Sequence, residues 1–137
     1  MKKLILFILA VCSVSIMFYF SSRTAQISSH QSDFIIDLLQ NIGIVFNSHT
    51  IRKLAHVIIF SIISFCISMF IGCYLDKIFW ISSISFLLSL CYACVDEYLQ
   101  TFIDGRHGCV GDVMIDACGI VIGLILYCII FNIIDNK

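Results

Sequence analysis

Four long apolar runs, separated by short polar segments, dominate the pattern of the chain. Each has about the 17–25 residues that a helix needs to cross the hydrocarbon core of a bilayer. The runs cover residues 4–20, 54–75, 78–95 and 113–134. This pattern predicts an all-α fold, a polytopic bundle of four transmembrane helices forming a single membrane domain over residues 1–137.

A fifth apolar pattern, within residues 33–46, differs from these runs. Phe34, Ile35, Leu38 and Leu39 recur at helical spacing, whereas polar residues take much of the opposite face. Ser32 precedes this segment as a reasonable N-cap. Because about 14 residues are too few to span a bilayer, the segment predicts a short amphipathic helix lying on the membrane surface or over the bundle.

The first apolar run also resembles a signal peptide, but the sequence after it is a poor cleavage site. Arg23 occupies the −3 position relative to Ala25, and Val11 is larger than the residue usual before a lipoprotein-box cysteine. We therefore expect an uncleaved helix. Lys2 and Lys3 place the amino terminus inside by the positive-inside rule.

Four spans then put both termini in the cytoplasm of a multi-pass protein of the bacterial cytoplasmic membrane. Counted together, the eight lysines and arginines divide evenly between the two sides. In either orientation, segments 21–53 and 96–112 share one membrane face. We expect this polar face to lie outside.

Composition agrees with a membrane protein and excludes other classes. The chain is 61% hydrophobic and 12% charged, whereas soluble domains carry about 25% charged residues. A net charge of −1 gives no basic field for nucleic acid. Seven of the eight cysteines lie in or beside apolar runs, where they act as small hydrophobic residues rather than as a disulfide framework.

Charged residues at two span ends oppose the helix dipole. Arg52 and Lys53 open the second span, with His56 one turn further on, although a helix amino terminus favours anions. Asp96 and Glu97 close the third span, where the dipole favours cations. Since both ends lie on one membrane face, we expect the two groups to compensate one another, directly or through a bound ligand.

The fourth span begins with two carboxylates and continues with two glycines. Asp112 and Asp116 lie four residues apart on one helix face, and Asp116 is about one turn inside the apolar run. Intramembrane acids are candidates for function. Gly119 and Gly123 form a GxxxG pattern, which predicts close packing against another helix.

One polar site is therefore predicted at this membrane face. Gln100 shares the helix face of Asp96, and the glycine-bracketed turn "DGRHG" presents Arg106. The predicted ligand-binding residues are Arg52, Lys53, His56, Asp96, Glu97, Gln100, Arg106, Asp112 and Asp116. We predict no cofactor and no dedicated metal site.

In their order along the chain, these motifs resemble the VanZ-like family of small bacterial integral membrane proteins. They are "FSS" at residues 20–22, "RKLAH" at 52–56, "DEYLQTFIDGR" at 96–106 and "DVMIDACGIVIG" at 112–123. Asp104 stands where the family usually has proline. The resemblance implies a protein of the cell envelope. The family's namesake is associated with low-level resistance to the antibiotic teicoplanin, without an established molecular activity, so teicoplanin-type resistance is one role that the resemblance suggests.

Three functions remain open. The preferred one is binding or handling of a lipid headgroup, a lipid-linked cell-wall precursor or a lipoglycopeptide, because cations at the membrane face suit phosphate. The second is a structural scaffold whose charges pair internally. The third is an enzyme in which the carboxylates and His56 hold Mg²⁺ or Mn²⁺ for phosphoryl transfer or hydrolysis. We expect membrane lipids as partners and no nucleic acid, and we leave a homo-oligomer open.

Overall fold

The computed structural model consists of five helices and describes residues 1–40, 47–106 and 108–135. The helices are α1 (Lys2–Ser21), α2 (Ala25–Gln40), α3 (Ser48–Ile71), α4 (Ile78–Gln100) and α5 (Val110–Asp135). Four of them, α1, α3, α4 and α5, are long and apolar enough to cross a membrane. The predicted all-α fold with four spans is confirmed.

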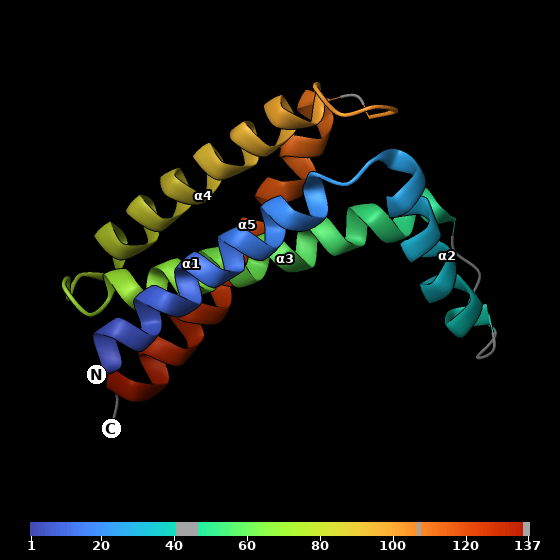
Figure 1. Cartoon of the computed structure of the whole chain (residues 1–137). Helices are drawn as coiled ribbons and strands as arrows, with labels where there is room; N and C mark the ends of the chain where they lie inside the picture. Colours follow the sequence, from blue (N-terminus) through green and yellow to red (C-terminus); the bar gives the residue numbers. More distant parts are fainter. Residues whose placement is uncertain (41–46, 107, 136–137) are drawn as a thin grey trace.

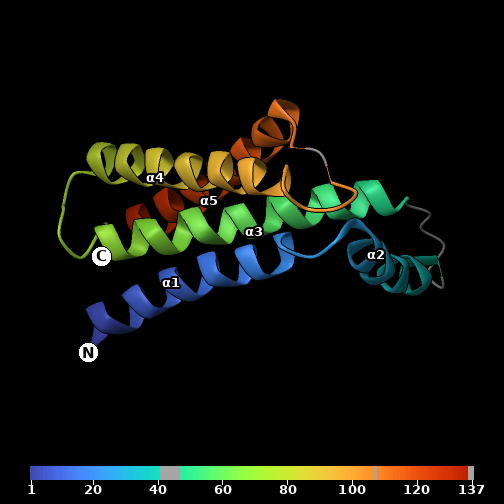
Figure 2. The same cartoon turned by 45° about the horizontal axis from the view of Figure 1, so that its top comes forward.

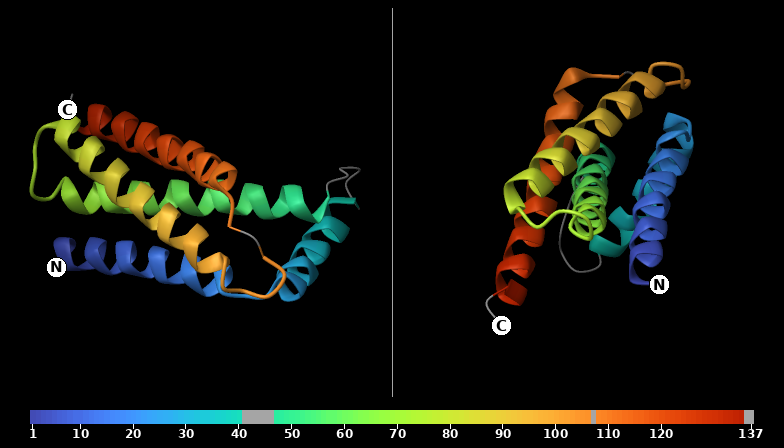
Figure 3. Two further views of the ribbon diagram at one scale, coloured as in Figure 1. Left: turned by 90° about the horizontal axis from the view of Figure 1, so that it is seen from above. Right: turned by 90° about the vertical axis from the view of Figure 1, so that its left-hand side faces the viewer.

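Helix α3 is the centre of the bundle and packs against each of the other four helices. Seen along the bundle, it lies between α5 and α1 (Figure 3, right). Its inward residues Phe60 and Ile63 are fully buried. Large apolar side chains such as Ile58, Leu87 and Ile125 instead point outward. Such an apolar exterior is expected for helices surrounded by lipid.

The spanning helices alternate in direction, so both chain ends lie at one end of the bundle (Figure 1). The connection from α1 to α3 and the loop from α4 to α5 lie together at the opposite end (Figures 1 and 2). The predicted grouping of segments 21–53 and 96–112 therefore holds in space. These segments carry most of the polar residues singled out from the sequence.

The short helix α2 is present but is displaced along the sequence from the prediction. It starts at Ala25, eight residues before position 33, and it is described as far as Gln40. Ser32 is not an N-cap, because it is buried inside α2 and its hydroxyl donates to the carbonyl of Ser28 at 3.0 Å. The predicted stretch 41–46 lies outside the described residues.

The second span also differs from its predicted bounds. Helix α3 begins at Ser48 rather than at residue 54, because the side chain of Asn47 caps it by accepting from the Thr50 amide at 2.7 Å. It ends at Ile71 rather than at residue 75. Apolar content alone missed this polar first turn, since the cap lies outside the hydrophobic run.

Candidate functional site

The polar residues meet where three helix ends come together. These are the amino-terminal part of α3, the carboxyl end of α4 and the amino end of α5, at the end of the bundle away from both termini (Figure 1). Helix α4 continues to Gln100, and α5 starts at Val110. The carboxylates at these two helix ends therefore lie beside α3. The site is thus built on helices rather than on loops.

Two ion pairs join α3 to α5. The ammonium of Lys53 lies 3.0 Å from Oδ1 of Asp112, and Nδ1 of His56 lies 3.2 Å from Oδ1 of Asp116. The first pair is about one-third exposed on each side, whereas the Asp116 side chain is only 1% exposed. Both pairs follow from the helical register, because their members are one turn apart on each helix.

Close approach of the same two helices depends on glycine. Gly119 and Gly123 are buried, and a Cβ at either position would overlap α3, at the Val57 carbonyl and at the Ser61 carbonyl respectively. The hydroxyl of Ser64 then reaches across to donate to the carbonyl of Ile120 at 3.0 Å. This packing, typical of GxxxG helices, fixes the distance at which the ion pairs form.

Helix α4 contributes two buried carboxylates that are held by an amide. Nε2 of Gln100 donates to Oδ2 of Asp96 at 2.8 Å and to Oε1 of Glu97 at 3.1 Å. The backbone amide of Cys109 donates to Oε2 of Glu97 at 3.0 Å. Oδ1 of Asp96 has no hydrogen-bond partner within the described ranges. Asp96 and Glu97 are therefore oriented by neutral donors, not neutralised.

Arg106 is presented by a tight turn. Its amide donates to the carbonyl of Ile103 at 3.0 Å, and Gly105 between them has φ 75°. A positive φ at the third position of a turn favours glycine. The side chain is only 7% exposed, and its Nε has no hydrogen-bond partner in the part of the chain that the structure describes.

The guanidinium of Arg106 lies in an unfavourable setting. Burial lowers its pKa below the usual arginine value, and the nearby charge of Arg52 lowers the pKa further, while Asp96 and Glu97 act in the opposite direction. Arginine nevertheless stays protonated in proteins. The protein therefore holds a buried positive charge close to a second arginine.

A large cavity lies beside this group, between α1, α2 and α3. Its volume is about 890 Å³, and we call it the arginine cavity because both Arg52 and Arg106 line it. A smaller pocket of about 30 Å³ lies against it. We call it the acidic pocket after Glu97, Asp112 and Asp116, although His49, Arg52, Lys53 and His56 also line it. Arg52 and His56 line both spaces, so they separate a cationic cavity from an acidic pocket.

The predicted site residues thus come together, but not with the expected pairing. Within residues 47–106 and 108–135, Lys53 and His56 of α3 pair with α5, and no cation of α3 forms an ion pair with Asp96 or Glu97 of α4. The dipole argument is also weaker than expected. Arg52 and Lys53 lie beyond the first turn of α3, and dipole effects fade within one turn.

Several residues of the site were missed by sequence reasoning. The arginine cavity is also lined by apolar and hydroxyl side chains of α1 and α2, including Met17, Phe20, Ser21, Ile27 and Ser28. Phe20 and Ser21 belong to the "FSS" motif but were not assigned to the site, Ile27 and Ser28 lie in the serine-dense stretch 21–32, and Met17 had no signal beyond its apolar run. The amide of Cys109 has no sequence signal, because any residue except proline supplies one.

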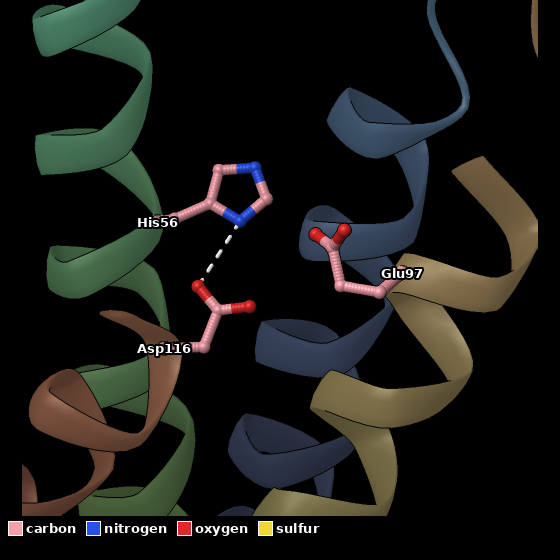
Figure 4. Close-up of side chains that lie close together, drawn as sticks. All are labelled: His56, Glu97 and Asp116. Carbon is pink, nitrogen blue, oxygen red and sulfur yellow. Dashed lines mark hydrogen bonds and ion pairs between the residues drawn. The ribbon is translucent and has the colours of Figure 1, made fainter. Parts of the chain in front are cut away.

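Three ligand-type side chains converge in the acidic pocket. Figure 4 shows His56 of α3, Glu97 of α4 and Asp116 of α5 turned toward a common space. One ligand atom from each lies within 4.8 Å of the others. Chemically, the region offers two guanidinium groups for an anion and, next to them, an imidazole and carboxylates for a cation.

Comparison with known proteins agrees with the order of the motifs. The profile of the family described as VanZ/LLP1 matches residues 6–132, nearly the whole chain and all of the polar site. Neither a curated protein nor a solved structure gives a significant match. Four spanning helices and this match over residues 6–132 make the chain a multi-pass membrane protein that belongs to the VanZ/LLP1 family.

Proposed function

We propose that this protein binds the phosphate-bearing headgroup of a membrane lipid or lipid-linked cell-wall precursor in the arginine cavity. Arg52 and Arg106 hold the phosphate. The observation that carries the proposal is the Arg106 side chain, which is buried although its Nε has no partner among the described residues. A buried charged donor without a partner is costly, and a bound anion removes that cost.

The second arginine strengthens the argument. Arg52 lines the same cavity and, within the described ranges, forms no ion pair. Two guanidinium groups that repel one another are stabilised by an anion between them. Arginine suits phosphate in particular, because its planar fork donates two parallel hydrogen bonds to two oxygens.

The walls of the cavity favour an amphipathic ligand over free phosphate. Apolar residues line much of it, among them Met17, Phe20, Ile27, Ile51 and Ile59. About 890 Å³ is within the range of small-molecule sites, which span about 300–1,000 Å³. A phosphate ion alone would leave this apolar space empty, whereas an acyl or isoprenoid chain next to the headgroup would fill it.

Native mass spectrometry of the detergent-purified chain tests the proposal, with phosphatidylglycerol and undecaprenyl phosphate as two separate probes. Arg106→Gln and Arg52→Gln are each expected to weaken binding about tenfold, as loss of a charge-assisted hydrogen bond implies. Arg23→Gln is the matched control, because Arg23 stacks on the Tyr19 ring outside the cavity. Its binding should equal that of the unaltered protein.

The two probes also separate the neighbouring hypotheses. Tighter binding of undecaprenyl phosphate than of phosphatidylglycerol identifies the wall precursor as the ligand class, and the reverse identifies bulk lipid. A third titration with teicoplanin tests the lipoglycopeptide. Binding of neither phosphate probe, or equal binding by Arg106→Gln and the unaltered protein, contradicts the proposal and leaves the scaffold hypothesis.

A further inference from the structure

The acidic pocket beside the arginine cavity gathers ligand atoms from three different helices. His56 comes from α3, Glu97 from α4 and Asp116 from α5 (Figure 4). One nitrogen and two carboxylate oxygens lie within 4.8 Å of one another. The sequence analysis predicted no dedicated metal site, but it kept open an enzyme in which the carboxylates and His56 hold Mg²⁺ or Mn²⁺.

Only one of the two carboxylate oxygens of Asp116 has a hydrogen-bond partner among the described residues. Its Oδ1 contacts Nδ1 of His56 at 3.2 Å, but its Oδ2 is buried without a hydrogen-bond partner among the described residues. In Figure 4 this second oxygen points into the space between Asp116 and Glu97. A carboxylate oxygen that is buried without a hydrogen-bond partner raises the free energy of the folded protein. A bound cation next to this oxygen would remove that cost.

The local charge balance points the same way. Three carboxylates here are nearly or fully buried, namely Asp96, Glu97 and Asp116. Of the cations on α3, Lys53 is paired with Asp112, and His56 is the only described side chain paired with any of the three. Gln100 supplies hydrogen bonds to two of them but no charge. Arg52 also lines the pocket, but within the described ranges it forms no ion pair with these carboxylates, and Oδ2 of Asp116 stays without a hydrogen-bond partner.

The surrounding hydrogen bonds orient Glu97 as they would a metal ligand. Both of its carboxylate oxygens accept hydrogen bonds, one from Gln100 and one from the Cys109 amide. Outer hydrogen bonds of this kind fix the orientation of ligating carboxylates. Ligand bonds of about 2.1 Å place neighbouring ligand atoms about 3.0–3.4 Å apart. Nδ1 of His56 and Oδ1 of Asp116, 3.2 Å apart, meet this spacing, and a ligand atom of Glu97 lies within 4.8 Å.

We infer that His56, Glu97 and Asp116 bind one divalent cation of the class that accepts mixed nitrogen and oxygen ligands, Mn²⁺ or Zn²⁺. Imidazole with carboxylates is a donor set that suits both ions. Three protein ligands leave coordination positions open. The inference does not depend on lipid binding, because none of its three ligands is one of the two arginines.

The test uses the full chain in detergent, stripped with EDTA and titrated with Mn²⁺. Manganese is the probe because thiolates prefer softer ions, so that the eight cysteines do not compete. Electron paramagnetic resonance of unbound Mn²⁺ should show one ion bound per chain. In a chain whose eight cysteines are replaced by serine, added Zn²⁺ should displace it, and failure of Zn²⁺ to displace it assigns the site to Mn²⁺.

Isosteric variants identify the ligands. Asp116→Asn and Glu97→Gln should each weaken Mn²⁺ binding at least about tenfold, whereas Asp104→Asn, an exposed carboxylate in the turn, should bind as the unaltered chain does. Equal binding by Asp116→Asn, or no bound Mn²⁺ in the unaltered chain, overturns the inference.

A measurement on folded, unaltered protein covers the case in which these variants do not fold. Electron spin echo modulation of bound Mn²⁺ should show coupling to a histidine nitrogen, and its absence also overturns the inference.

Discussion

His56 and Asp116 lie 60 positions apart in the sequence, yet their side chains are 3.2 Å apart and join α3 to α5. Asp116 is fully buried, and His56 is about one-quarter exposed. A charged hydrogen bond in this setting is worth about 1.5–3 kcal/mol. A double-mutant cycle of His56→Ala and Asp116→Ala should therefore give a coupling free energy of about 1–3 kcal/mol. Equilibrium unfolding in mixed micelles with EDTA measures it.

Lys53 and Asp112 form the matched comparison on the same two helices. Their side chains are 37% and 33% exposed, and exposed pairs contribute about 0–1 kcal/mol. The same cycle on Lys53→Ala and Asp112→Ala should yield a coupling below about 1 kcal/mol, decreasing as salt is added. A coupling as large as that of His56 and Asp116 would contradict the dependence on burial.

Gly123→Ala tests the close packing of α5 on α3. Its new Cβ would overlap the Ser61 carbonyl and the Ser64 hydroxyl, and overpacking of this kind costs about 1–3 kcal/mol. Gly111→Ala is the control, since its Cβ would meet only the Cys109 sulfur at 3.5 Å. We expect the first variant to lower the free energy of unfolding and the second to leave it equal or slightly higher. Equal effects would argue against glycine-dependent packing.

Asp104→Pro tests the turn that presents Arg106. Asp104 occupies the second position of a turn closed by the hydrogen bond from Arg106 to Ile103, with positive φ at Gly105. Proline favours this position, and compatible prolines stabilise by about 0.4–1 kcal/mol. We expect higher stability and unchanged or tighter lipid binding. Gly105→Ala should have the opposite effect, because alanine disfavours positive φ.

Cysteine labelling tests the predicted sidedness. In a chain that keeps only Cys109, which is exposed in the α4–α5 loop, an impermeant maleimide should react in spheroplasts. A Lys77→Cys reporter in an otherwise cysteine-free chain lies at the opposite end of the bundle. It should react only in inverted vesicles. The reverse pattern would place the polar site in the cytoplasm.

The sequence by itself determined the class of fold and showed that the residues of the site gather at one face of the membrane. Runs of about 20 apolar residues leave a chain few alternatives to spanning helices, and four spans place segments 21–53 and 96–112 together in either orientation. The spacing of Asp112 and Asp116, and of Gly119 and Gly123, fixed which residues share a face of α5. These are local properties of a helix.

Only the tertiary structure decided which charged side chains form ion pairs with one another. The sequence suggested that Arg52 and Lys53 compensate Asp96 and Glu97, directly or through a bound ligand. The direct pairs among the described residues instead run from α3 to α5, where glycine allows the two helices to approach closely. With this pairing, two buried atoms have no hydrogen-bond partner among the described residues. They are Nε of Arg106 and Oδ2 of Asp116. Pairing depends on the distance and rotation between helices, and neither is encoded by periodicity along one of them.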